Sequence, residues 1–130
     1  MNPELAALAT VALVHFATVF TAQRFLTRDI GKDGNTGTRE GMEDKLSTVT
    51  LRLRRATANF TENIGPFIIA VLVVVLAGKT STATAVLAWV FVAVRVIYVP
   101  AYAFAWVPWR SLIWVIGAGA TLALLILGLI

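Results

Sequence analysis

Two apolar stretches of the sequence carry charged and polar side chains at helical spacing. In the first stretch these residues, at steps of three, four and three, are Arg52, Arg55, Asn59 and Glu62. In the second stretch, at steps of three and four, they are Arg95, Tyr98 and Tyr102. Such steps place side chains along one face of a helix. Because arginine binds carboxylates through paired hydrogen bonds, the two faces together predict a site for a polar, anionic ligand.

These side chains lie in runs of apolar residues that are long enough to cross a membrane. The sequence of 130 residues is 58% hydrophobic and only 14% charged, whereas soluble domains are about one quarter charged. A helix rises about 1.5 Å per residue, so roughly 20 apolar residues span a hydrocarbon layer. Four segments meet this length, and we expect helices at about residues 4–26, 45–77, 80–107 and 109–130. The predicted fold class is an all-α membrane protein, with a single domain over residues 1–130 built as an antiparallel four-transmembrane-helix bundle.

A very short turn at Gly78 and Lys79 joins the second and third expected helices. The two helices must therefore be antiparallel neighbours, and residues equally far from the turn lie at equal depth. This counting places Glu62 opposite Arg95. Since a charge inside the hydrocarbon needs a partner, we predict that Glu62 and Arg95 form a structural ion pair. Polar residues often serve only to hold membrane helices together, but one ion pair would be enough for that, so the larger set favours a ligand site.

Most of the charge lies in and beside one connection between helices. Eight of the eleven Lys and Arg residues and five of the seven Asp and Glu residues fall between Arg24 and Arg55. Positively charged loops stay in the cytoplasm, so we expect residues 27–44 to be cytoplasmic and the N-terminus to lie outside. The net charge of +4 fits such a loop beside anionic lipid headgroups. No nucleic-acid partner is expected.

The residue types limit the chemistry that the chain can perform alone. The sequence has no Cys, and its single His is His15. A thiolate nucleophile and a thiolate metal site are thereby excluded, and we expect no metal. His15 lies in the first apolar segment, where a lone His is more often a packed, hydrogen-bonded side chain than a catalyst. A reaction that needs a thiol would have to take it from a second molecule.

The polar positions resemble the signature of the MAPEG family, the membrane-associated proteins in eicosanoid and glutathione metabolism. The family's second-helix motif RA-x-x-N-x-x-E-x-x-x-P-F is matched from Arg55 to Phe67. The third expected helix supports the resemblance through the spacing of Arg95, Tyr98 and Tyr102, and the fourth begins with Arg110. The chain length and the layout of four helices fit the same family.

The resemblance implies a homotrimer of four-helix bundles that binds glutathione as co-substrate between neighbouring subunits, near the cytoplasmic face. It also implies an integral protein of a bacterial inner membrane. Carried onto this sequence, the residues that would hold glutathione are Arg52, Arg55, Asn59, Glu62, Tyr98 and Tyr102. Arg110 is the candidate catalytic residue, because a nearby guanidinium lowers the pKa of a thiol from about 8.5 and favours the thiolate. Arg24 and Arg28 have no clear counterpart in the family pattern.

Three functional interpretations follow. The first is a glutathione-dependent transferase or peroxidase that acts on a lipophilic electrophile or hydroperoxide arriving from the lipid bilayer. The second is a lipid-mediator-binding scaffold of the same fold without catalysis. The third and least favoured is a small multidrug exporter, which also uses four helices in a chain of about this length. Such exporters place an essential Glu inside the first helix, whereas Glu4 here lies at the outer end of that helix.

Overall fold

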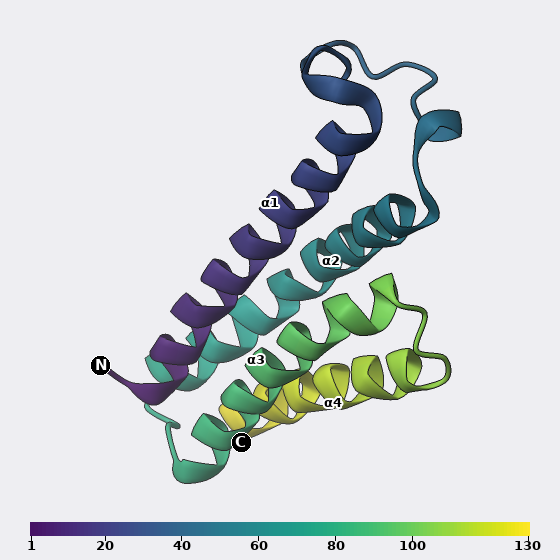
Figure 1. The fold of residues 1–130 in the computed structure, drawn as a ribbon. Coiled ribbons are helices and arrows are strands. Elements are labelled where there is room, and N and C mark those ends of the chain that lie inside the picture. The colour runs from purple at the N-terminus through teal and green to yellow at the C-terminus, as the bar shows by residue number, and fades with distance from the viewer.

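The computed structural model describes all 130 residues, which form four long helices (Figure 1). Their bounds are α1 Pro3–Thr36, α2 Thr48–Leu76, α3 Thr82–Ala103 and α4 Trp109–Leu129, with a short 3-10 helix, η1, at Glu43–Lys45. Each of the four is long and apolar enough to cross a membrane, and no strand is present. The chain is an all-α, four-helix integral membrane protein, which confirms the predicted fold class.

Consecutive helices run in opposite directions, so α1 and α3 point the same way (Figure 1). α1 packs against α2 and α3, and α4 packs against the same two helices from another side. α2 and α3 therefore form the middle of the bundle, and they carry all of the predicted site residues except Arg110.

Side-chain caps mark the beginning of three of the four long helices. The side chain of Asn2 accepts hydrogen bonds from two backbone N–H groups at the start of α1, and Ser47 and Ser81 do the same for one N–H each in α2 and α3. These are the residue types that best satisfy the unpaired N–H groups of a first helical turn. The buried carboxylate of Glu4 accepts a hydrogen bond of 2.5 Å from the hydroxyl of Thr84. This contact ties the start of α1 to the start of α3.

Tight packing holds α4, which carries Arg110, against the middle of the bundle. A Cβ atom added to Gly117 would lie 2.9 Å from Cγ1 of Val94 in α3, and one added to Gly128 would lie 2.8 Å from Cγ1 of Val73 in α2. Both distances are too short for real atoms, so only glycine allows these approaches. Small residues serve this purpose in many membrane bundles.

Two helix ends differ from the sequence-based expectation. α1 continues to Thr36 rather than ending near residue 26, so the connection to α2 is shorter than residues 27–44. The length of an apolar segment indicates where a helix leaves the bilayer, but the helix can continue beyond that point in polar residues. α1 is interrupted only at Gly31, whose φ of 75° is accessible mainly to glycine. At the other end, α3 stops at Ala103 rather than near 107, because the chain turns at Ala105 with a φ of 54°.

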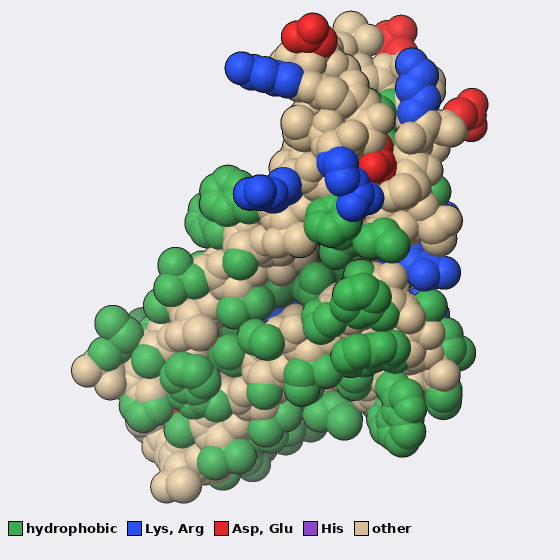
Figure 2. Space-filling model, in the orientation of Figure 1, with side chains coloured by type: hydrophobic (Ala, Val, Ile, Leu, Met, Phe, Trp, Pro, Cys, Tyr) green, Lys and Arg blue, Asp and Glu red, His purple; other side chains and the backbone are tan.

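Apolar and charged side chains occupy different parts of the surface along the length of the bundle. Figure 2 shows hydrophobic side chains over most of the visible face and charged side chains gathered around the far end of α1 and its connection to α2. Exposed apolar side chains on every helix are what a lipid-facing surface requires, and the charged end suits water and lipid headgroups.

Candidate functional site

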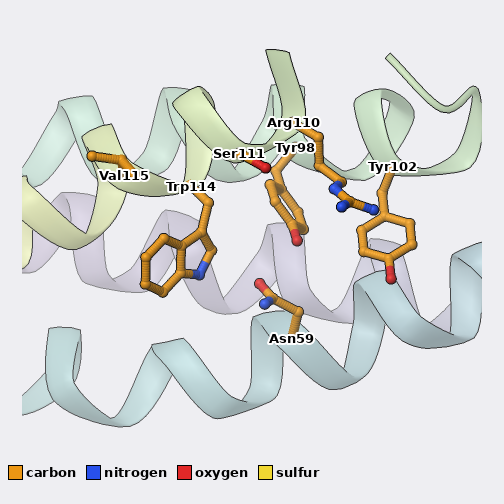
Figure 3. A pocket seen from close by; sticks show the side chains of 7 residues that line it. All are labelled: Asn59, Tyr98, Tyr102, Arg110, Ser111, Trp114 and Val115. Atoms are coloured by element: carbon orange, nitrogen blue, oxygen red, sulfur yellow. The ribbon is translucent and has the colours of Figure 1, made fainter. Parts of the chain in front are cut away.

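A pocket of about 320 Å³ opens between α2, α3 and α4. We call it the tyrosine pocket, and its lining residues are Asn59, Tyr98, Tyr102, Arg110, Ser111, Trp114 and Val115. Figure 3 shows the side chains of Tyr98 and Trp114 directed toward Asn59 across the pocket. The volume is within the range of small-molecule sites. The structure thus brings together four of the residues singled out in the sequence, from three different helices.

Arg110 stands in the first turn of α4, at the edge of the tyrosine pocket. Its guanidinium carbon lies 4.7 Å from the ring centre of Tyr102, and Figure 3 shows the guanidinium between Tyr102 and Tyr98. The single ion pair of the chain joins Arg28 to Asp29, so no carboxylate neutralises Arg110. A guanidinium held by ring contact alone keeps its N–H donors free for an anionic ligand.

Asn59 is oriented by Arg95 from the neighbouring helix. Nη1 and Nη2 of Arg95 donate to Oδ1 of Asn59 at 3.1 and 3.3 Å. The Arg95 side chain is 1% exposed and lies near the rings of Phe60 and Tyr98. Because the oxygen of Asn59 is engaged with Arg95, the amide nitrogen is the group that Asn59 has free to offer to a ligand.

The predicted ion pair between Glu62 and Arg95 is not present. Arg95 bonds to Asn59, and its charge has no carboxylate within 4.0 Å. Counting from the turn gave the depth of each residue but not its direction around the helix. Residues three apart on a helix point about 60° away from each other. Asn59 faces α3, whereas Glu62 is exposed and points toward the groove between α2 and α1.

None of the three arginines of α2 lines the tyrosine pocket. Nη1 of Arg52 donates to the backbone oxygen of Ala103 at 3.4 Å, at the last residue of α3. A cation there satisfies a carbonyl that the helix itself leaves unpaired. Arg55 is exposed on the outer surface of α2. Within a single chain, the residues predicted to bind glutathione therefore do not form one site. Asn59, Tyr98 and Tyr102 line the tyrosine pocket, and Arg52, Arg55 and Glu62 lie outside it.

A second pocket, of about 430 Å³, lies between α1 and α2. We call it the α1–α2 pocket, and its lining residues are Val19, Ala22, Gln23, Arg54, Thr57, Ala58, Thr61 and Glu62. Of these, only Glu62 was singled out from the sequence. Arg54 and Gln23 were missed because neither belongs to the motif that drew attention to α2.

Sequence reasoning also missed three residues that line the tyrosine pocket from α4 beside Arg110, namely Ser111, Trp114 and Val115. Trp114 and Val115 follow Arg110 and Ser111 by four residues each, which places the two pairs on adjoining stripes of one helix surface. This spacing was visible in the sequence.

His15 and the two arginines near the end of α1 lie outside the tyrosine pocket. Nε2 of His15 lies 3.0 Å from the hydroxyl of Thr61, and its ring packs edge-on against Phe60. His15 therefore has the packed, hydrogen-bonded environment expected of a lone membrane His. Arg28 lies over the ring of Phe25, and Arg24 is exposed.

The fold and the tyrosine pocket define a class, the integral membrane proteins of four helices with an arginine-containing pocket between them. The sequence model of the MAPEG family matches residues 5–130. The chain belongs to the MAPEG family, which comprises glutathione-related membrane transferases and peroxidases and lipid-mediator proteins. This match confirms the resemblance to the MAPEG family. It gives no support to the interpretation of the chain as a small multidrug exporter. Comparisons with curated proteins and with solved structures gave no match.

Proposed function

We propose that the protein is a glutathione-dependent membrane transferase or peroxidase and that glutathione binds in the tyrosine pocket. Family membership supports this function. The observation that carries it is Arg110, a guanidinium without a carboxylate partner, in one pocket with Asn59, Tyr98 and Tyr102. Glutathione carries carboxylates, an amine and a thiol. Guanidinium, amide and phenol groups can form hydrogen bonds with these groups of the ligand.

Arg110 would act by stabilising the thiolate of bound glutathione. A free thiol with a pKa near 8.5 is only a few per cent ionised at neutral pH, and an adjacent fixed cation increases that fraction. The proton leaves to water, so no general base is required. In a transfer reaction the sulfur then forms a bond to an electrophilic carbon of the lipophilic substrate. With a hydroperoxide it attacks an oxygen, the O–O bond breaks to release the alcohol, and a second glutathione completes the disulfide with loss of water.

A second copy of the chain would complete the site, in a homotrimer. Arg55 and Glu62 are both exposed on α2, and neither charge could remain facing lipid. The α1–α2 pocket adds Arg54 and Gln23 to this polar surface. We propose that this surface packs beside the tyrosine pocket of the next copy. Arg55 and Glu62 would then hold the carboxylates and the γ-glutamyl amine of glutathione, with Arg52 nearby.

The same proposal sets the orientation in the membrane. The charged end of α1 and its connection to α2 would be cytoplasmic, in a bacterial inner membrane, and both chain termini would lie on the outer side. The tyrosine pocket begins at Arg110, at the end of α4 nearer the cytoplasm, where glutathione would enter.

Binding of glutathione can be tested by thermal unfolding of the detergent-solubilised protein. A ligand at a hundredfold excess over its dissociation constant stabilises the folded state by about 2.7 kcal/mol. We expect glutathione and its S-methyl derivative both to raise the unfolding temperature, since the carboxylates and amine carry the binding. No shift with either compound at millimolar concentration would refute the proposal. Stabilisation without thiolate formation would instead identify the lipid-mediator-binding scaffold.

A further inference from the structure

We propose that the protein binds a lipid headgroup that carries both a primary ammonium and a phosphate, as in phosphatidylethanolamine, where α1 and α3 begin. A pocket of about 410 Å³ lies there, and Asn2, Glu4, Ser81 and Thr82 are among its lining residues. We call it the Glu4 pocket. It shares no lining residue with the tyrosine pocket, and the proposal does not depend on glutathione.

Glu4 is a buried residue whose carboxylate has one oxygen bonded and one free. Its side chain is 1% exposed, and Oε1 accepts from the hydroxyl of Thr84 at 2.5 Å, a distance typical of a hydroxyl that donates to an ionised carboxylate. Oε2 makes no hydrogen bond, yet the only fully enclosed side-chain polar atom without a partner is Nε of Arg95. Oε2 therefore keeps a small accessible surface, which lies toward the pocket that Glu4 lines.

No positive charge of the chain balances the Glu4 carboxylate. The single ion pair joins Arg28 to Asp29, so no basic group lies within 4.0 Å of Glu4. A buried charge needs a counter-charge and further hydrogen bonds to offset its lost hydration. A metal ion would require several oxygen ligands, and the chain has no group of three acidic or histidine side chains that could hold one. A primary ammonium, which donates hydrogen bonds to single acceptors, is the cation that fits.

The start of α3 adds hydrogen-bond donors to the same pocket. The side chain of Ser81 accepts from the N–H of Thr84, and its carbonyl accepts from the N–H of Ala85. The N–H groups of Thr82 and Ala83 have no acceptor in the chain. Free N–H groups in a first helical turn attract phosphate. The Glu4 pocket therefore offers an acceptor for a cation near donors for an anion.

A lipid headgroup with both charges matches these groups. Phosphatidylethanolamine carries its ammonium and its phosphate on either side of a short ethylene link. The apolar segments of α1 and α3 begin at this pocket, so the pocket lies at the edge of the bilayer, where headgroups are found. Phosphatidylcholine has the same phosphate, but its nitrogen carries only methyl and methylene groups and cannot donate a hydrogen bond. We therefore expect the pocket to select phosphatidylethanolamine.

Phosphatidylethanolamine and phosphatidylcholine with identical acyl chains test this selection. The delipidated protein in detergent is titrated with each lipid, and bound lipid is counted by native mass spectrometry. We expect phosphatidylethanolamine to bind about tenfold more tightly, as one charge-assisted hydrogen bond would give. The N,N-dimethyl derivative keeps one N–H and should have an intermediate affinity. Equal affinities for the three lipids would overturn the proposal.

Three variants locate the binding. Glu4→Gln keeps an acceptor for Thr84 but removes the charge, and it should abolish the preference for phosphatidylethanolamine. Glu43→Gln, at an exposed acid in η1, is the control and should retain it. Thr82→Pro removes one free N–H at the first position of α3, where proline is well tolerated, and should weaken binding of both lipids. Full preference in Glu4→Gln, its loss in Glu43→Gln, or unchanged affinities in Thr82→Pro would contradict the site.

O-Phosphoethanolamine, the soluble headgroup without acyl chains, distinguishes a lipid from a free metabolite. The apolar surface beside the pocket should hold the acyl chains of the lipid, so the soluble compound should not displace phosphatidylethanolamine at equal concentration. Displacement under that condition would assign the pocket to a soluble molecule and overturn the assignment to a lipid.

Discussion

Arg95 donates from both terminal nitrogens to the side-chain oxygen of Asn59, and this contact joins α3 to α2 in the interior of the bundle. It orients the only α2 residue that lines the tyrosine pocket. It also holds the guanidinium of Arg95 beside the rings of Phe60 and Tyr98. The same hydrogen bonds therefore contribute both to the tyrosine pocket and to the contact between α2 and α3.

The first prediction concerns this contact. Asn59→Ala removes the acceptor and leaves a buried guanidinium unsatisfied, which should lower the free energy of unfolding by about 2–3 kcal/mol. Asn59→Asp keeps an acceptor and adds an opposite charge, so it should retain most of the stability. Both variants can be measured by unfolding in detergent. A loss below about 0.5 kcal/mol in Asn59→Ala would show that the contact contributes little.

The second prediction concerns Arg110. Arg110→Ala should leave glutathione bound but return the pKa of its thiol toward the free value of about 8.5. The ultraviolet absorbance of the thiolate, recorded across a pH series, should then appear at higher pH than in the wild type. Arg24→Ala is the matched control, because Arg24 is exposed and outside the pocket. An unchanged titration in Arg110→Ala would remove Arg110 from the mechanism.

The third prediction concerns the packing of α4. Gly117→Ala places a Cβ 2.9 Å from Val94 and should destabilise the protein by about 1–3 kcal/mol. Gly119→Ala, two residues later, meets nothing within 4 Å and should be neutral or stabilising by up to about 1 kcal/mol. The unfolding temperatures of the two variants provide the comparison. Similar values for both would mean that the approach of α4 to α3 is looser than described.

The fourth prediction concerns assembly. The chain has a mass of 14.0 kDa, and native mass spectrometry after detergent removal should give three times that mass. Glu62→Lys reverses an exposed charge of α2 and should weaken the assembly, whereas Glu43→Lys, exposed in η1, should not. A monomer as the main wild-type species would argue against a site completed by a second copy.

Much of the architecture could be predicted because the bilayer imposes simple rules. Apolar length alone gave the four helices. The motif on α2 and the spacing on α3 selected residues of which Asn59, Tyr98 and Tyr102 do meet in one pocket with Arg110. These positions were accessible from sequence because helical spacing determines which side chains share a face.

The features that could not be predicted depend on how the helices pack and rotate against one another, which helical spacing alone does not determine. Equal depth suggested Glu62 as the partner of Arg95, but the rotation of α2 turns Asn59 inward and Glu62 outward. The small pocket between α1 and α3 depends on how two non-consecutive helices approach each other, which no local pattern encodes. The extension of α1 to Thr36 was missed because polar helical turns beyond the bilayer leave no signal in hydropathy.

The most direct test is a structure of the protein in lipid with glutathione bound. The account predicts glutathione in the tyrosine pocket, with its sulfur beside the guanidinium of Arg110 and its peptide part near Asn59 and the two tyrosines. Glutathione bound elsewhere, with the tyrosine pocket filled by lipid, would contradict it.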